Sequence, residues 1–247
     1  MSQKPYSCDH VVPIEEEPRH HLVLENEFVR GFAVEIAPHD RTLCHHHPND
    51  YLLYVAGGAE ILSVARDEKP KRLSYRDGEC DLAPGGLVHV VENLSERAFR
   101  NIVIELLPGA GSLLRGARPK VVRGECTVRS GFSHERAAVF MIEMEPGAEA
   151  ELFGPAVVAT PYDDGLNPED AGDVEVKHNV ISDLAWIPPG RGAVLWQCRN
   201  SPERAIAFQV GITDGAFVAV PKKGEPVRRL RASCHEEDFS PTRNPRL

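Results

Sequence analysis

The stretch GECDLAPGGLVHVVEN, residues 78–93, decides the fold. Its middle, APGG at 83–86, combines proline and glycine in the way that tight turns require. The run that follows, LVHVVEN at 87–93, is rich in valine and has the length of a β-strand. A turn followed at once by a short valine-rich strand is typical of β-barrels and β-sandwiches when it recurs along a chain.

The same pattern of short apolar runs and turn clusters continues on both sides of this stretch. Residues 21–37 alternate and are rich in Val, Ile and Phe, and residues 51–67 form two apolar runs joined at Gly57 and Gly58, which predicts a hairpin. No apolar period of 3.6 residues continues for more than about two helical turns. The chain is therefore predicted to be all-β.

Composition and charge exclude several classes of protein. The 247 residues are 42% hydrophobic and 26% charged, which is typical of a globular chain with one large domain or two. The net charge of −9 argues against nucleic acid as a partner. No apolar run is long enough to span a membrane, and the start MSQKPYSCDH lacks an apolar signal core, which predicts a cytoplasmic location. The six cysteines form no CxxC pair, so we expect reduced thiols and no disulfide framework.

The chain contains an internal repeat. AVEIAP at 33–38 reappears as MIEMEP at 141–146, and NLSERA at 93–98 reappears as NSPERA at 200–205, with offsets of 108 and 107 residues. Two matches at nearly the same offset predict a tandem duplication of a β unit of roughly 100 residues. The predicted organisation is a first barrel at 20–107, a linker at 108–125, a second barrel at 126–221 and a tail at 222–247.

The opening stretch matches a known family motif. Gly78, Pro84, Gly86, His89 and Asn93 occupy every fixed position of G-x5-P-x-G-x2-H-x3-N, the second motif of the cupin superfamily. The resemblance implies a tandem double-stranded β-helix, that is, two jelly-roll barrels forming a bicupin. The resemblance is strong over about residues 20–107. The second half is included only because it repeats the first.

Residues 38–58 resemble the first cupin motif, G-x5-H-x-H-x3-E-x6-G, with His45 and His47 as its histidine pair and Gly58 as its closing glycine. Residues 45 and 47 are two apart, so on a strand both side chains point to the same face. His89, on another strand, could then meet them inside a small barrel. The resemblance therefore implies His45, His47 and His89 as metal ligands.

A second register of the first motif competes with this one. It would use Cys44, His46 and Asp50, with the acid at the glutamate position. The repeat favours the first register, in which Tyr51 stands where the family usually has glutamate. This departure leaves a three-histidine site, with Tyr51 and Asp50 nearby as candidate acid, base or weak ligand.

Three neutral imidazoles can hold a divalent metal and leave positions open for water or substrate. In this respect the site is similar to the iron-dependent thiol and diketone dioxygenases of the superfamily. The favoured prediction is an Fe2+ dioxygenase acting on a small organic molecule, although Mn2+, Ni2+ or Zn2+ would fit the same ligands. The alternatives are an isomerase, lyase or hydrolase that uses the metal as a Lewis acid, and a non-catalytic metabolite-binding bicupin. Paired β-barrels also make a homo-oligomer plausible.

The second half lacks these metal-ligating histidines. At the repeat offsets, the three ligand positions become Phe153, Pro155 and Trp196, all of them apolar. We therefore expect a degenerate second barrel without a metal, packed against the first barrel or covering its open end.

Overall fold

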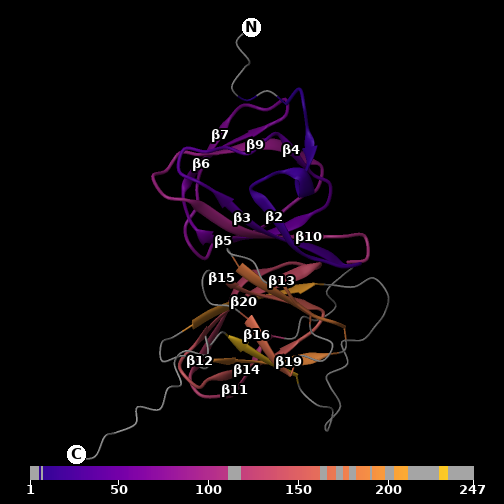
Figure 1. The fold of residues 1–247 in the computed structure, drawn as a ribbon, viewed down its shortest axis with the longest axis vertical. Coiled ribbons are helices and arrows are strands. Elements are labelled where there is room, and N and C mark those ends of the chain that lie inside the picture. The colour runs from indigo at the N-terminus through magenta and orange to yellow at the C-terminus, as the bar shows by residue number, and fades with distance from the viewer. Residues whose placement is uncertain are drawn as a thin grey trace, which may run out of the picture.

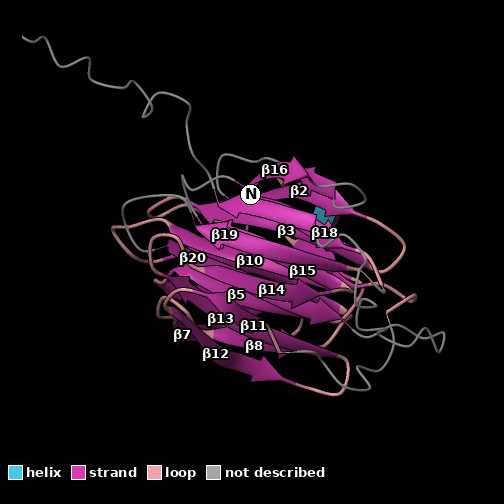
Figure 2. Ribbon diagram, turned by 90° about the horizontal axis from the view of Figure 1, so that it is seen from below, coloured by secondary structure: helices cyan, strands magenta, loops and turns pink. Residues whose placement is uncertain are grey.

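The structure is a computed structural model, and it describes residues 6, 8–110, 118–161, 166–170, 175–177, 182–189, 191–197, 203–210 and 228–232. These residues form two β-barrels, one above the other along the longest axis (Figure 1). Strands make up nearly all of the described chain, and the short 3-10 turn η1 (Ile14–Glu16) is its one helical segment (Figure 2). The predicted all-β fold with tandem jelly-roll barrels is confirmed. Among the described residues, no helix is long and apolar enough to cross a membrane.

The first barrel consists of two five-stranded sheets. One has the order β1-β4-β9-β6-β7 and the other the order β2-β3-β10-β5-β8, and every pairing within them is antiparallel except β1 with β4. The strands are β1 (Val12–Pro13), β2 (His20–Glu25), β3 (Val29–Ile36), β4 (His45–His47), β5 (Tyr51–Gly57), β6 (Glu60–Ala65), β7 (Lys71–Ser74), β8 (Cys80–Ala83), β9 (Leu87–Asn93) and β10 (Phe99–Leu106).

The second barrel repeats this plan. Its sheets have the orders β11-β14-β19-β21-β16 and β12-β13-β20-β15-β18-β17. Strand β13 lies 108 residues after β3 at both of its ends, which is the offset of the sequence repeat. The strands are β11 (Lys120–Arg123), β12 (Cys126–Ser133), β13 (Ala137–Met144), β14 (Glu149–Phe153), β15 (Ala156–Pro161), β16 (Leu166–Asp170), β17 (Glu175–Lys177), β18 (Ser182–Ile187), β19 (Gly192–Gln197), β20 (Glu203–Val210) and β21 (Arg228–Ala232).

The two faces of strand β10 contribute side chains to two different apolar cores. Phe99 and Val103 point into the first barrel, where they join its interior cluster. Ile102, Ile104 and Leu106 point outward and join a second cluster that lies between the barrels. Because side chains alternate along a strand, one β10 can line the barrel interior and also bind the neighbouring barrel.

The core between the barrels is continuous and apolar. From the first barrel it takes residues such as Leu52 and Tyr54, and from the second barrel it takes Leu184, Ile206 and Phe208, which are almost completely buried. The Tyr54 and Phe208 rings meet edge to face with centroids 6.5 Å apart. A shared apolar core of this kind holds two barrels together by the burial of surface that each would otherwise expose to water.

Two strands lie outside the two predicted barrel ranges. Strand β21 lies within the predicted tail, yet it pairs with β16 and β19 of the second barrel. Strand β11 lies within the predicted linker and pairs with β14. Both are short segments whose apolar residues are few, so only their pairing with strands distant in sequence identifies them as part of a sheet.

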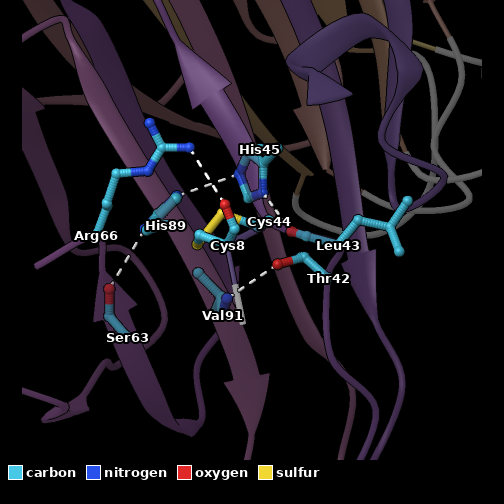
Figure 3. Close-up of a disulfide and its surroundings, with 9 residues drawn as sticks. All are labelled: Cys8, Thr42, Leu43, Cys44, His45, Ser63, Arg66, His89 and Val91. Atoms are coloured by element: carbon cyan, nitrogen blue, oxygen red, sulfur yellow. Dashed lines mark hydrogen bonds between the residues drawn. A yellow bond between two sulfur atoms is a disulfide. The ribbon is translucent and has the colours of Figure 1, made fainter. Parts of the chain in front are cut away.

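The prediction of reduced thiols is wrong for one pair of cysteines, because Cys8 and Cys44 form a disulfide (Figure 3). The cause is the parallel pairing of β1 with β4, in which the amide of Val12 donates to the Cys44 carbonyl oxygen at 3.0 Å. Spacing along the sequence gave no sign of this pairing. Disulfides are typical of oxidising compartments, and the cytoplasmic location stays a prediction. Cys80 and Cys126 are free, and the remaining two cysteines lie outside the described residues.

Candidate metal centre

The predicted histidine trio gathers at one point of the first barrel. His45 on β4 lies directly opposite His89 on β9, and His47 follows two residues later on the same face of β4. The Nε2 atom of His45 lies 3.1 Å from the Nε2 atom of His47 and 3.1 Å from that of His89. All three side chains are buried, with at most 8% of their surface exposed.

The turn of the second motif holds the first motif in place. Gly86 has a φ of +85°, a conformation that residues with a side chain rarely adopt. In that conformation its amide donates to the carbonyl oxygen of His47 at 2.8 Å. The glycine of one motif therefore fixes the strand that carries the histidines of the other.

A fourth histidine, His20, joins the cluster from the other sheet. It begins β2, and its ring centroid lies 4.6 Å from that of His45 and 5.8 Å from that of His47. One ligand atom each from His20, His45 and His47 can be chosen so that all lie within 4.8 Å of one another. His20 belongs to neither motif, so the motifs do not identify it. The available signal was its position at the start of a predicted strand.

The contacts of the outer ring nitrogens orient two of these histidines towards the centre. His45 Nδ1 lies 3.0 Å from the Leu43 carbonyl oxygen, and His20 Nδ1 lies 2.8 Å from a carboxylate oxygen of Glu17. A carbonyl or carboxylate oxygen can only accept, so each Nδ1 carries a proton and each ring turns its Nε2 edge towards the centre. This is the arrangement that metal-ligating histidines adopt in proteins.

The other two histidines are held more loosely. His89 Nδ1 lies 3.3 Å from the hydroxyl of Ser63. His47 Nδ1 is buried without a hydrogen-bond partner in the described part of the chain. Its ring is instead stacked on that of Tyr51, with the centroids 4.2 Å apart and an angle of 24° between the planes. Stacking therefore sets the orientation of His47.

Burial keeps the imidazoles of His45, His47 and His89 uncharged. Loss of water, with the neighbouring His20, lowers the pKa of His45 to about 4. The same burial, together with the adjacent imidazoles, lowers the pKa of His47 and of His89 far below the usual range for histidine. At neutral pH these rings are neutral, which is the form that binds a metal ion.

Glu17 connects the two sheets beneath the cluster. One of its carboxylate oxygens accepts from the Leu43 amide at 3.1 Å, and the other accepts from the Arg19 amide and from His20. Burial alone would raise the pKa of Glu17, but the hydrogen bond and charge of His20 and the two amides outweigh it and lower the pKa. An ionised carboxylate therefore lies behind His20 and beside the strand that carries His45.

The two residues predicted as candidate acids or bases lie in different surroundings. Tyr51 is buried against His47, and burial raises the pKa of its hydroxyl above the usual value. Asp50 turns away from the cluster: one carboxylate oxygen accepts from the Gly85 amide at 2.8 Å, and the other forms an ion pair with Arg136 of the second barrel. Asp50 therefore contacts the second barrel and a turn, whereas Tyr51 contacts a histidine of the centre.

The competing register of the first motif does not assemble a centre. Cys44 is in the disulfide, His46 lies on the opposite face of β4 from His45, and Asp50 is paired with Arg136. Only the register that starts at His45 brings its residues together in the described structure.

A cavity of about 220 Å3 adjoins the histidines inside the first barrel. Its wall is made of aliphatic and aromatic side chains from both sheets, and His20, His47 and His89 form one end of it. None of the residues that line it is Asp, Glu, Lys or Arg. The site can therefore hold a metal ion at the end of a mostly apolar chamber.

The second barrel has no equivalent cluster among its described residues. Strand pairing also changes one sequence expectation there. Glu149 is opposite Trp196, but the interior cluster of this barrel contains their neighbours Ala150 and Leu195, which are opposite each other. The inward-facing pair that corresponds to His45 and His89 is therefore Ala150 and Leu195, because the second barrel is shorter before β14 and a constant offset fails. The residues differ from those that the constant offset gave, and both are apolar.

Comparison with known proteins supports the architecture. No protein-family model matches the chain, and no curated protein sequence matches it. Among solved structures, vicilin from Capsicum annuum is similar over 81% of this chain and 83% of its own, at 15% identity and a TM-score of 0.55. A variant of oxalate decarboxylase from Bacillus subtilis is similar over 76% of this chain and 70% of its own, at 12% identity and a TM-score of 0.50.

A salicylate 1,2-dioxygenase from Pseudaminobacter salicylatoxidans covers 77% of this chain and 76% of its own, at 12% identity and a TM-score of 0.48. Identities this low carry information about the fold alone. The similarity to vicilin and oxalate decarboxylase, together with the complete second motif, the internal repeat and the two stacked barrels, leads to one conclusion. The chain has the cupin fold twice over, as a bicupin.

Proposed function

We propose that the first barrel is the metal-dependent half of a bicupin enzyme that acts on a small organic molecule, and that its reaction is dioxygenation with Fe2+. The observation that carries the proposal is the convergence of buried imidazoles at one end of a cavity, with Nδ1 of His20 hydrogen-bonded to Glu17 and Nδ1 of His45 hydrogen-bonded to the Leu43 carbonyl oxygen. The buried, neutral imidazoles of His45, His47 and His89 have lone pairs that water no longer hydrates, and a bound cation would replace that hydration.

Neutral ligands are the chemical reason for favouring iron and oxygen. Four neutral imidazole ligands would not offset the charge of a bound Fe2+. The nearby carboxylate of Glu17, which is hydrogen-bonded to His20, would offset part of it. The ion would supply the one-electron chemistry with O2 that side chains lack. His20, His45, His47 and His89 would hold it, and the adjoining cavity would hold the substrate beside it and keep bulk water out.

Tyr51 has a supporting role in the proposal. With its pKa raised by burial, the hydroxyl keeps its proton at neutral pH and can donate a hydrogen bond to a group bound near His47. Asp50 is given no chemical role, because its carboxylate is bound to Arg136 and the Gly85 amide.

Oxygen consumption tests the reaction type. The protein is reconstituted anaerobically with Fe2+ and then mixed with aerated buffer and a panel of uncharged ring and short-chain compounds in an oxygen electrode. We expect one iron per chain and substrate-dependent oxygen uptake, which His89→Ala abolishes. Turnover without oxygen uptake would contradict the dioxygenase and favour a Lewis-acid isomerase, lyase or hydrolase. Absence of stoichiometric metal would contradict the enzyme and favour a metabolite-binding bicupin.

A further inference from the structure

The cavity beside the histidines has a polar amide that the proposed metal centre does not use. Asn101 on β10 lines the cavity, and only 4% of its surface is exposed to solvent. In the described part of the chain its side-chain amide has no hydrogen-bond partner. A buried amide without a partner is costly, so its donor and acceptor atoms are suited to a bound molecule.

Strand register places Asn101 at a fixed distance from the histidines. In the sheet β2-β3-β10, His20 lies opposite Val34, and Val34 lies opposite Asn101. The three residues form one row across the sheet, and all three line the cavity. Since adjacent strands are about 4.8 Å apart, roughly 10 Å separates the backbones of His20 and Asn101. A molecule the size of one ring with a small substituent spans this row.

The rest of the wall restricts the charge of that molecule. Phe99 and Tyr75 stack with centroids 5.7 Å apart and form an aromatic part of the wall, and Val91 and Val103 add aliphatic surface. No lysine or arginine lines the cavity to neutralise a carboxylate or phosphate. An anionic group away from the metal would lose its hydration without gaining a counter-charge.

Volume sets the size. An apolar cavity of about 150 Å3 is known to hold benzene. The cavity here is about 220 Å3, which leaves room for a ring with one or two small substituents. Leu73 on β7 lines the cavity and is 36% exposed, so the opening to solvent lies at this edge strand.

We infer that the substrate is a compact molecule with an uncharged, largely apolar body, bound by a metal-ligating group at the histidine end and by a hydrogen bond to the Asn101 amide. The part of the inference that concerns the metal-ligating group rests on the proposed function. The part that concerns the apolar body of the substrate rests on the cavity alone. Asn101 is the specificity-determining residue in this assignment, because strand register places its amide on the cavity wall at ring distance from His20.

Binding of three matched probes tests the inference: phenol, which can bond to Asn101; toluene, which cannot; and benzoate, which is charged. Each is titrated into the protein as purified and after chelator treatment, with ligand-observed NMR as the readout and metal content measured on every sample. On the chelator-treated protein, where no metal can bind the carboxylate, we expect phenol to bind about tenfold or more tightly than benzoate. In Asn101→Leu, phenol should weaken by about fivefold and toluene should bind at least as well as in the wild type.

A gain-of-function variant completes the test. Leu73→Arg brings a cation to the opening, and we expect it to strengthen benzoate binding while toluene is unaffected. Benzoate binding as tight as phenol on the chelator-treated protein, equal weakening of phenol and toluene in Asn101→Leu, or no probe binding to the wild type would each overturn the inference. If the probe ranking holds but the protein takes up no stoichiometric metal even after reconstitution, the proposed function fails while the assignment of the cavity stands.

Discussion

The two barrels of this chain share a plan and differ in what fills them. The interior of the second barrel is packed with alanine and larger apolar side chains, such as Ala150, Ile142 and Leu195. The interior of the first barrel contains an apolar cluster, a cavity and four buried histidines from three strands. The difference teaches that the jelly roll tolerates either interior, and that a few register positions decide whether a barrel can bind a metal ion.

The largest expected effect concerns what the barrels share. Phe208 is fully buried in the core between them, whereas Leu195 is buried inside the second barrel. Phe208→Ala should cost about 3–5 kcal/mol and lower the protection of both barrels, because it leaves a cavity at their common face. Leu195→Ala should cost about 2–5 kcal/mol and lower protection mainly in the second barrel.

Hydrogen exchange followed by mass spectrometry separates these outcomes, with β10 reporting on the first barrel and β20 on the second. Equal protection of β10 in Phe208→Ala and in the wild type would show that the barrels fold independently.

The next effect concerns metal binding, the property in which the two barrels are expected to differ. His45→Ala removes the imidazole that lies 3.1 Å from both His47 and His89, so metal affinity should fall by more than about 100-fold. The matched control is Glu149→Gln, on the strand of the second barrel that corresponds to β4, and it should leave metal content unchanged. Elemental analysis of the purified variants measures both. Metal loss in the control, or retention in His45→Ala, would contradict the assignment of the site to the first barrel.

A smaller effect concerns pH in the metal-free protein. The folded pKa of His45 is about 4, below the ordinary value of about 6.5, so the unfolded chain takes up a proton first as the pH falls. The stability from the neutral ring is fully present above about pH 6.5 and is lost progressively down to about pH 4. At pH 5.5 this one group should increase the opening equilibrium of β4 and β9 about tenfold.

Hydrogen exchange of chelator-treated protein, corrected for the intrinsic pH dependence of exchange, measures this opening. Strands β14 and β19 serve as the internal control, because no buried histidine is found in the described residues of the second barrel. A matching loss of protection in β14 and β19 would show that the acid sensitivity does not come from the histidine cluster.

The smallest effect concerns the polar link between the barrels. Arg136 pairs with Asp50, and both side chains are about one-third exposed. Arg136→Gln should therefore lower stability by about 1 kcal/mol or less, measured by denaturant unfolding. It should leave metal affinity unchanged, since Asp50 contributes nothing to the histidine cluster in this account. A large loss of metal in this variant would contradict this prediction and indicate that Asp50 contributes to the metal site.

The sequence predicted the strands, the repeat and the gathering of His45, His47 and His89, because all of these depend on spacing within one motif or on alternation along one strand. It did not predict His20 or the Cys8–Cys44 disulfide. Each depends on pairing between segments far apart, namely β2 with β3 and β1 with β4. The role of Asn101 was hidden for the same reason, since its distance from His20 is a property of three paired strands.

The same limit explains the error in the second barrel. A constant offset aligned His45 with Phe153, but a shorter connection before β14 moves the register, so the inward-facing pair is Ala150 and Leu195. Repeats preserve the order of strands better than they preserve loop lengths. Equivalent positions are therefore identified by strand pairing and not by counting residues.

The central claim is that one metal ion binds in the first barrel and none in the second. Anomalous diffraction from crystals of the purified protein, recorded on both sides of the absorption edge of the metal found by elemental analysis, tests it directly. The account predicts a single anomalous peak per chain, surrounded by the Nε2 atoms of His45, His47 and His89 with His20 beside them. A peak in the second barrel, or no peak among these histidines in protein that contains stoichiometric metal, would contradict it.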